Sequence, residues 1–264
     1  MKNHIVRTAF RFALFLISMQ FIAACTGNSE HEETSTHAEQ THWGYKGENG
    51  PTAWGALSAD YVLCAEGKQQ SPIDIAAGST EDLPEIAFDY RPAELSIVNN
   101  GHTIQVNYAA GSSIEVAGAA YQLLQFHFHA PSEHTINGKH SALEMHLVHQ
   151  NADGALAVVG VMINSGQTNQ QFAPVWGELP RKADEARRFE NLSINADNLL
   201  PDERKYYTYD GSLTTPPCSE GVTWFVLQSP IEMSESQITT FEDIIRDNNR
   251  PVQSLNGREI LVHK

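Results

Sequence analysis

The chain has 264 residues, of which 41% are hydrophobic and 19% are charged, so it allows one domain of ordinary size or two small ones and excludes wholesale disorder. Lys and Arg number 17 against 32 Asp and Glu, and the resulting net charge of -15 would repel a polyanion, so we expect no nucleic-acid partner. No apolar run reaches the roughly 18 residues that a membrane-spanning helix needs.

The first 24 residues predict a signal peptide of the lipoprotein type. Lys2, Arg7 and Arg11 precede an apolar stretch, residues 12–24, which is the order of charge and hydrophobicity in a secretory signal. The tetrapeptide Ile-Ala-Ala-Cys at its end resembles a bacterial lipobox, whose cysteine becomes lipidated. We therefore expect an exported protein of the periplasm or cell envelope, held to a membrane only through a lipidated Cys25. The alternative is a plain signal peptide that happens to end near a cysteine.

Residues 25–42 predict a polar tether. They are rich in glutamate and show no apolar period, so they cannot bury enough surface to order themselves. His31, His37 and His42 lie in this stretch and could scavenge metal, but a solvated spacer is the favoured interpretation.

The cysteine count agrees with export. Three cysteines are an odd number for an exported chain, and a lipidated Cys25 would explain the odd one. Cys64 and Cys218 then remain as one pair in an oxidising compartment, although two buried free thiols would also fit.

From residue 43 onward, short runs of alternating apolar and polar residues predict β-structure, and turn signals such as Asn99-Asn100-Gly101 separate them. The expected strands are 96–108, 113–116, 121–129, 141–149, 155–163 and 222–227, and the expected helices are 172–176 and 236–247. No linker divides this region. We therefore predict a mainly β (α+β) single domain over residues 43–264, with a central twisted, mostly antiparallel sheet and short peripheral helices.

Two of these strands carry a candidate metal site. Residues two apart on a strand share a face, so Gln125, His127 and His129 point one way and the intervening phenylalanines point into a core. On the next strand, Glu144 and His146 share a face that could lie opposite. Three neutral imidazoles with a fourth position left for water form a catalytic zinc site, and Gln125 and Glu144 are placed to orient ligands. A lone His-x-His pair would be weak evidence, because strand histidines are more often ordinary core or surface residues.

Longer segments resemble the α-class carbonic anhydrases and occur in that family's order. They are QQSPIDI (69–75), NNGH (99–102), QFHFH (125–129), EMHLVH (144–149) and YDGSLTTPPC (209–218), with WGY (43–45) and NRPVQ (249–253) near the two ends. The resemblance covers residues 43–264.

The resemblance implies a zinc enzyme, with one Zn²⁺ per chain, that reversibly hydrates carbon dioxide to bicarbonate and a proton by means of zinc-bound hydroxide. His127, His129 and His146 match the zinc ligands. Thr214 matches a gatekeeper hydroxyl that orients the hydroxide and donates to Glu133. His102 matches the histidine that carries the proton out.

Further positions match residues that line the family's pocket or stabilise its fold. Tyr45 and Asn100 match polar groups that order the pocket water, and Thr215 matches a residue of the polar side. The apolar wall that holds carbon dioxide matches Val148, Val158, Leu213 and Trp224. Cys64 and Cys218 match a disulfide of exported members, and a homo-oligomer is possible.

Two other classes fit part of the pattern. His127, His129 and Glu133 have the spacing of the first motif of cupin-type metal oxygenases or isomerases, but the residues before His146 do not match the second motif. A zinc-storage or adhesion lipoprotein would use the histidine-bearing tether, but such a protein has no use for Thr214 and His102. Bound iron or manganese would favour the cupin, and metal loss on deletion of the tether would favour the storage protein.

Overall fold

The computed structural model describes residues 41–264, which form one compact unit. The predicted signal peptide, Cys25 and most of the tether lie outside the described residues. The strands are β1 (Asp74–Ile75), β2 (Ser79–Glu81), β3 (Ala87–Asp89), β4 (Ala93–Asn99), β5 (Ile104–Asn107), β6 (Ser113–Val116), β7 (Ala119–His129), β8 (Thr135–Ile136), β9 (Leu143–Gln150), β10 (Leu156–Ser165), β11 (Glu185–Ile194), β12 (Tyr206–Ser212), β13 (Glu220–Leu227), β14 (Ile231–Met233) and β15 (Leu261–His263). The helices are α1 (Trp54–Leu57), α2 (Leu63–Glu66), α3 (Ala173–Trp176) and α4 (Glu235–Glu242), with short 3₁₀ turns at Gly47–Asn49, Ala59–Tyr61, Gln170–Phe172 and Ala196–Leu199.

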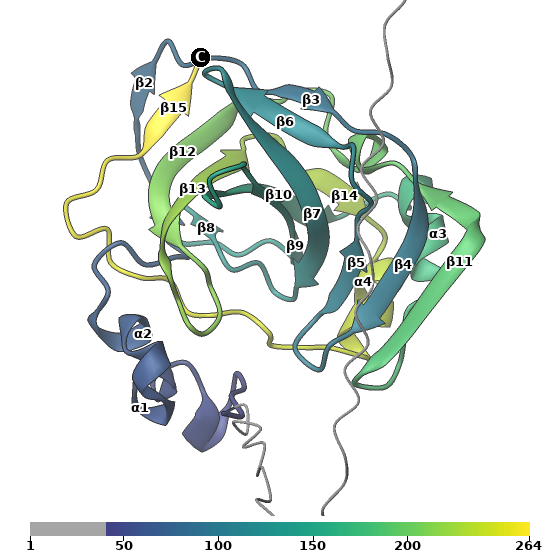
Figure 1. Cartoon of the computed structure of the whole chain (residues 1–264), viewed down its shortest axis with the longest axis horizontal. Helices are drawn as coiled ribbons and strands as arrows, with labels where there is room; N and C mark the ends of the chain where they lie inside the picture. Colours follow the sequence, from purple (N-terminus) through teal and green to yellow (C-terminus); the bar gives the residue numbers. More distant parts are fainter. Residues whose placement is uncertain (1–40) are drawn as a thin grey trace, which may run out of the picture. The chain divides into compact units, whose positions relative to one another are not determined.

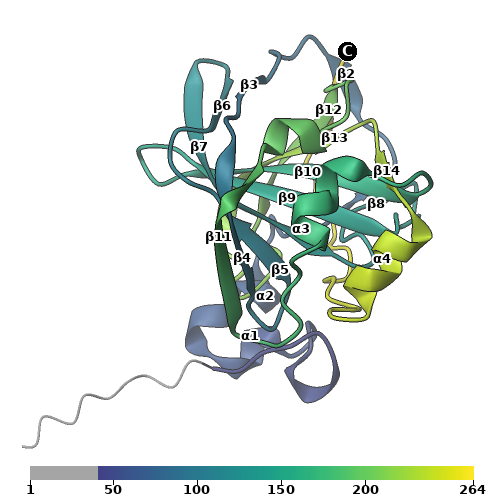
Figure 2. The ribbon, with the colours of Figure 1, turned by 90° about the vertical axis from the view of Figure 1, so that its right-hand side faces the viewer.

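A single mixed sheet of 13 strands dominates the fold, in the order β11-β4-β5-β7-β9-β10-β13-β12-β15-β2, with β3, β6 and β14 attached to it. Most neighbours are antiparallel; the parallel pairs are β10 with β13, β10 with β14, and β15 with β2. Figure 1 shows how strongly the sheet twists, and Figure 2 shows α3 and α4 packed on one of its sides. The predicted fold class is confirmed. Among the described residues, no helix is both long and apolar enough to cross a membrane.

The alternation of β7 places two different environments on the two faces of the sheet. Phe126 and Phe128 have no exposed surface and belong to the larger core, where the ring of Phe128 meets Phe172, Trp176 and Phe241 of the flanking helical segments. The histidines of the same strand therefore face the other way. Burial of aromatic rings of this size fixes the orientation of β7.

The expected strand 96–108 is wrong as a single element, because a turn interrupts it between β4 and β5. The Asn99 carboxamide oxygen accepts the N–H of Gly101, and that of Asn100 accepts the N–H groups of His102 and Thr103. Gly101 has a φ of 82°, a conformation that glycine adopts without strain. Asparagine side chains of this kind replace ladder bonds with local ones.

The helix expected at 236–247 is also shorter. Eight strands were not expected, of which six have only two or three residues and β11 and β12 are long. A capping box between Ser234 and Gln237 starts α4 at Glu235, and the helix ends at Glu242. The strand β11 has a half-exposed, charge-rich sequence without clean alternation, and β12 reads partly as a turn because of Asp210 and Gly211.

His149 lies on the core face of β9 and has no exposed surface. Its Nδ1–H points at the Ala157 carbonyl oxygen, 3.3 Å away, and the Tyr90 hydroxyl lies 2.8 Å from Nε2, to which it donates. Burial lowers the pKa of His149 to about 4, although the neighbouring carbonyls favour the charged ring.

This buried imidazole predicts acid sensitivity. An unfolded histidine has a pKa of about 6.5, so the unfolded chain takes up a proton first, and stability is lost as the pH falls from about 6.5 towards about 4. Between pH 7 and pH 5, His149 should account for about 2 kcal/mol of lost stability. His149→Leu should remove that part of the pH dependence. Urea unfolding of both proteins at the two pH values measures it, and equal pH dependence would contradict the assignment.

Candidate metal centre

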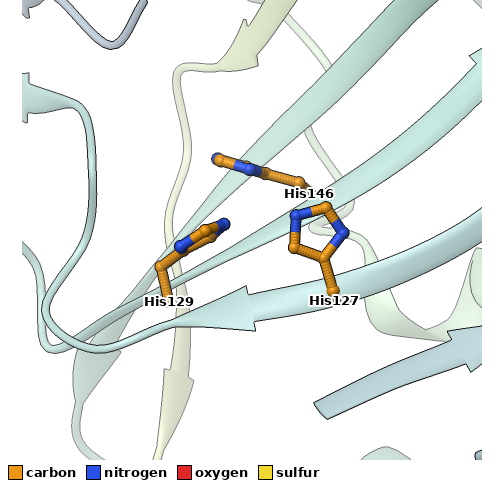
Figure 3. Close-up of side chains that lie close together, drawn as sticks. All are labelled: His127, His129 and His146. Carbon is orange, nitrogen blue, oxygen red and sulfur yellow. The ribbon is translucent and has the colours of Figure 1, made fainter. Parts of the chain in front are cut away.

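Three imidazoles converge where β7 and β9 run side by side. The antiparallel register pairs His127 with His146, which confirms the predicted pairing of the two strands. One ring nitrogen each from His127, His129 and His146 lies within 4.8 Å of the others. Figure 3 shows the three rings turned towards one another. His129 and His146 are about 1% exposed, whereas His127 is half-buried, so the centre opens on the side of His127.

Hydrogen bonds on the outer side fix two of the rings. The Nδ1–H of His127 donates to the Gln125 side-chain oxygen over 2.8 Å, and that of His129 donates to the Asn248 carbonyl over 2.7 Å. Both rings are therefore held with Nε2 facing the centre. The Nε2 atom of His129 is buried and has no hydrogen-bond partner within residues 41–264, so its lone pair is available to a metal ion.

His146 has the opposite ring orientation to His127 and His129, with Nδ1 rather than Nε2 facing the centre. Its Nε2 lies 2.9 Å from Glu144 Oε1, off the axis of a good hydrogen bond, while its Nδ1 faces Glu133 Oε2 at 3.9 Å, on the side of the centre. The second Glu144 oxygen accepts the N–H groups of Glu133 and His134, each over 2.8 Å. Burial alone would raise the pKa of Glu144, but His134 and His146 hold it well below the usual value.

The protonation states suit a metal. Burial lowers the pKa of His129 to about 4, and burial together with the neighbouring imidazoles lowers the pKa of His127 well below its usual value. Burial also lowers the pKa of His146, against the opposing charge of Glu144. Neutral imidazoles offer lone pairs without first having to lose a proton. Three such donors fit zinc with one position left open.

Glu133 lies beside the same centre. Its Oε1 accepts the N–H of Arg250 over 2.8 Å, and its Oε2 lies 3.6 Å from His129 Nε2. Burial raises the pKa of Glu133 to about 7, against the effects of His146, the Arg250 N–H and the Thr214 hydroxyl. Thr214 is thus close to the carboxyl, although no hydrogen bond of good geometry joins them, and Oε2 has no such partner among the described side chains.

One apolar cluster forms a wall next to the histidines. Val158 and Trp224 are buried in it, and Val148 and Leu213 pack against it half-buried. The parallel pairing of β10 with β13 brings Val158 opposite Trp224, whose ring centroid lies 4.8 Å from that of His146. The four residues of the predicted apolar wall therefore do lie together, with the buried Val222 as a member that the sequence did not reveal.

His102 lies on the turn between β4 and β5, next to a cavity of about 570 Å³. Its ring stacks on Trp43 with a centroid distance of 3.7 Å, and Tyr45 approaches the same ring at 6.5 Å. Burial lowers the pKa of His102, and the neighbouring His42 lowers it further. Asn100 shapes this turn with its side-chain oxygen, which is a structural use that the sequence-based interpretation did not include.

The loop after β12 is fixed by a covalent bond. Cys218 is joined to Cys64 of α2, with 5.0 Å between the two Cα atoms, so the predicted disulfide is present in the structure. The bond ties α2 to the loop that carries Thr214, which is buried, and Thr215, which is half-buried.

Sequence reasoning missed four residues around this centre. Asn248 and Arg250 hold His129 and Glu133 through their backbone groups, and His134 and Tyr209 extend the contacts of Glu144. Arg250 and Tyr209 did lie inside the motifs NRPVQ and YDGSLTTPPC. Asn248 and His134 carried no signal, because their partners are distant in the sequence or depend on tertiary packing.

The comparisons with known proteins agree on one family. The family model for eukaryotic-type carbonic anhydrase matches residues 49–264. A carbonic anhydrase of Nostoc sp. is 40% identical, over 95% of this chain and 96% of the relative, and one of Klebsiella pneumoniae is 45% identical, over 84% and 91%. The solved structure of the α-carbonic anhydrase of Thermovibrio ammonificans, in complex with the inhibitor sulfanilamide, is 45% identical, covers 84% of this chain and 99% of its own, and superposes with a TM-score of 0.82.

Proposed function

Because this chain belongs to the eukaryotic-type (α) carbonic anhydrase family, we propose that it interconverts carbon dioxide and bicarbonate on one zinc ion held by His127, His129 and His146. The observation that carries the zinc proposal is the buried Nε2 of His129, which has no hydrogen-bond partner in the described part of the chain and faces two further imidazole nitrogens. When bound, zinc acts as a Lewis acid that lowers the pKa of a water molecule to about 7.

The residues around the centre would orient the nucleophile and bind carbon dioxide. Glu133 offers Oε2 as an acceptor next to Thr214. In the proposed arrangement the Thr214 hydroxyl would donate to Glu133 and keep its own oxygen as an acceptor towards the centre. The Thr214 oxygen would accept a hydrogen bond from the nucleophile at the centre and so orient that nucleophile towards carbon dioxide. The wall of Val148, Val158, Leu213 and Trp224 suits carbon dioxide, which is small and uncharged, and Thr215 belongs to the polar side of the pocket.

The proton must leave by another route, and we assign this to His102, with Tyr45 and Asn100 ordering water between it and the centre. Histidine is the side chain whose ordinary pKa lies nearest to neutral pH, although burial lowers the pKa of His102 itself, and the cavity beside Trp43 gives the ring access to solvent. None of these three side chains belongs to the three-histidine cluster.

Export and anchoring remain proposals on the sequence alone. A cleaved signal peptide and a lipidated Cys25 would place the enzyme in the periplasm or cell envelope on a polar tether. Mass spectrometry of the mature N-terminus tests this, because a diacylglyceryl-modified Cys25 differs in mass from a free one.

The test of the function is stopped-flow hydration of carbon dioxide by residues 41–264, with and without a zinc chelator. We expect activity that disappears with the metal and returns when one equivalent of Zn²⁺ is added. Full activity of metal-free protein would contradict the proposal, and tight binding of iron or manganese in its place would favour a cupin-type chemistry.

His102→Ala should slow turnover at least about tenfold in dilute buffer while leaving zinc binding intact, because only proton export is impaired. Imidazole buffer should restore the rate, since a small base can replace the missing ring. His42→Ala is the matched control, because His42 is an exposed histidine beside the same cavity. If no buffer restored the turnover of His102→Ala, the role of His102 would be structural. If His42→Ala lost as much turnover, His102 would not be the specific carrier of the proton.

A further inference from the structure

A chain of buried hydrogen bonds leads away from the metal centre, starting at Glu144. His134 Nδ1 lies 2.7 Å from Glu144 Oε1, and the Tyr209 hydroxyl lies 2.6 Å from His134 Nε2. Ser71 Oγ lies 2.8 Å from the Tyr209 hydroxyl and accepts the N–H of Ser212 over 3.1 Å. All five residues are at most 4% exposed, so these polar groups have no access to bulk water.

Within this series of hydrogen bonds, every donor points the same way, from Ser71 towards Glu144. A carboxylate can only accept, so His134 donates through Nδ1–H and its Nε2 becomes an acceptor. The Tyr209 hydroxyl then donates to that Nε2, and the Ser71 hydroxyl donates to the Tyr209 oxygen. A completed buried network of this kind is rigid, whereas a network with one member missing leaves buried groups unpaired.

The surroundings leave no room for a replacement partner. The Trp224 ring lies against both imidazoles, with centroids 4.7 Å from His134 and 4.8 Å from His146. A β-carbon added at Gly211 would collide with Ser71 Oγ. The backbone can therefore approach Ser71 this closely only because residue 211 is glycine. The Arg258 guanidinium covers the outer face of the Tyr209 ring at 5.5 Å.

This packing makes the orientation of His146 depend on residues that do not touch the centre. Glu144 Oε1 lies 2.9 Å from His146 Nε2 and is shared with His134, while the other oxygen is held by two backbone N–H groups. If His134 turned, Glu144 would lose the partner that fixes Oε1 between the two rings. Tyr209 is the only described side chain that holds His134 at Nε2, and Ser71 anchors Tyr209 to the start of the segment that leads to Thr214.

We propose that His134 and Tyr209 are positioning residues of the metal centre, which act through Glu144 to hold His146 and so slow the release of zinc. The inference rests on the zinc site proposed above. Loss of a residue that orients a metal ligand without binding the metal typically lowers metal affinity by about 10- to 100-fold.

The test is the rate of zinc release from the holoenzyme to excess chelator in Tyr209→Phe, which removes the hydroxyl and keeps the ring. We expect release about tenfold faster than in the wild type. Tyr206→Phe is the matched control, because Tyr206 lies on the same strand β12, is 1% exposed and donates one hydrogen bond to the Pro84 carbonyl. It should lose similar stability yet release zinc at the wild-type rate.

A second comparison separates action through Glu144 from general loosening of the fold. In a Glu144→Gln background, adding Tyr209→Phe should leave zinc release unchanged, because the link to His146 is already altered. A further tenfold acceleration there, or wild-type release in Tyr209→Phe itself, would overturn the inference. If Tyr209→Phe does not fold, Ser71→Ala carries the test: accelerated release supports the inference and the wild-type rate overturns it. A wild-type protein that takes up no zinc would instead refute the zinc site.

Discussion

His129→Ala is expected to lose zinc and turnover almost completely. The Nδ1–H of His129 is already committed to the Asn248 carbonyl, and its Nε2 is a buried atom with no hydrogen-bond partner among the described residues. Removing this ring takes away a direct ligand, and nothing else described there can replace it. The loss should exceed the roughly 10- to 100-fold that removal of an outer partner costs.

Gln125→Ala provides the comparison, because Gln125 orients a zinc ligand without binding zinc itself. The carboxamide makes one contact with the centre, the 2.8 Å bond from His127, so its removal frees the ring without deleting a ligand. Zinc should then bind more weakly while the purified protein remains active. His140→Ala is the neutral control, because His140 is an exposed histidine whose one side-chain hydrogen bond within residues 41–264 is to the Ser132 carbonyl.

Elemental analysis of zinc per chain in the three purified variants decides the assignment. Near-zero zinc in His129→Ala, partial zinc in Gln125→Ala and full zinc in His140→Ala is the expected order. One full equivalent of zinc in His129→Ala would show that the ligands lie elsewhere.

The sequence predicted the local part of this site well because strands obey a strict period of two. The alternation Gln125, His127, His129 against Phe126 and Phe128 gave the shared face directly, and the structure keeps it. The pairing of β7 with β9 followed from a short connection between two patterned strands, and the observed register places His127 opposite His146.

Non-local contacts were beyond such reasoning. Asn248 reaches His129 across 119 positions, and no local pattern distinguishes it from other loop asparagines. The parallel pairing of β10 with β13 depends on packing of the whole sheet, so the grouping of Val158 with Trp224 came only through resemblance to a known family. The turn at 99–103 shows the opposite failure, because a recognised turn signal was placed inside a longer expected strand.

Thr214→Val should retain zinc and lose turnover by about 100-fold, the scale on which a positioned hydrogen-bonding group contributes to a transition state. Valine has nearly the same shape, so the buried site stays filled and the change removes only the hydroxyl beside Glu133. Thr223→Val is the control, since Thr223 alternates with Val222 and Trp224 on β13 and so lies on the face away from the apolar wall. Its turnover should equal that of the wild type.

Glu133→Gln tests the same arrangement from the other side. The Arg250 N–H donates to Oε1, so the amide oxygen must take that place and the amide nitrogen must replace Oε2 next to Thr214. That nitrogen donates instead of accepting, so it would reverse the hydrogen bond that we propose from Thr214 and remove the acceptor that the Thr214 oxygen would offer to the centre. Turnover should fall at least as far as in Thr214→Val, and the double variant should be little slower than the slower single one, because the two residues act as one unit. Multiplied losses in the double variant, with zinc fully bound in all three, would mean that Thr214 and Glu133 contribute separately and that the orienting pair is wrong.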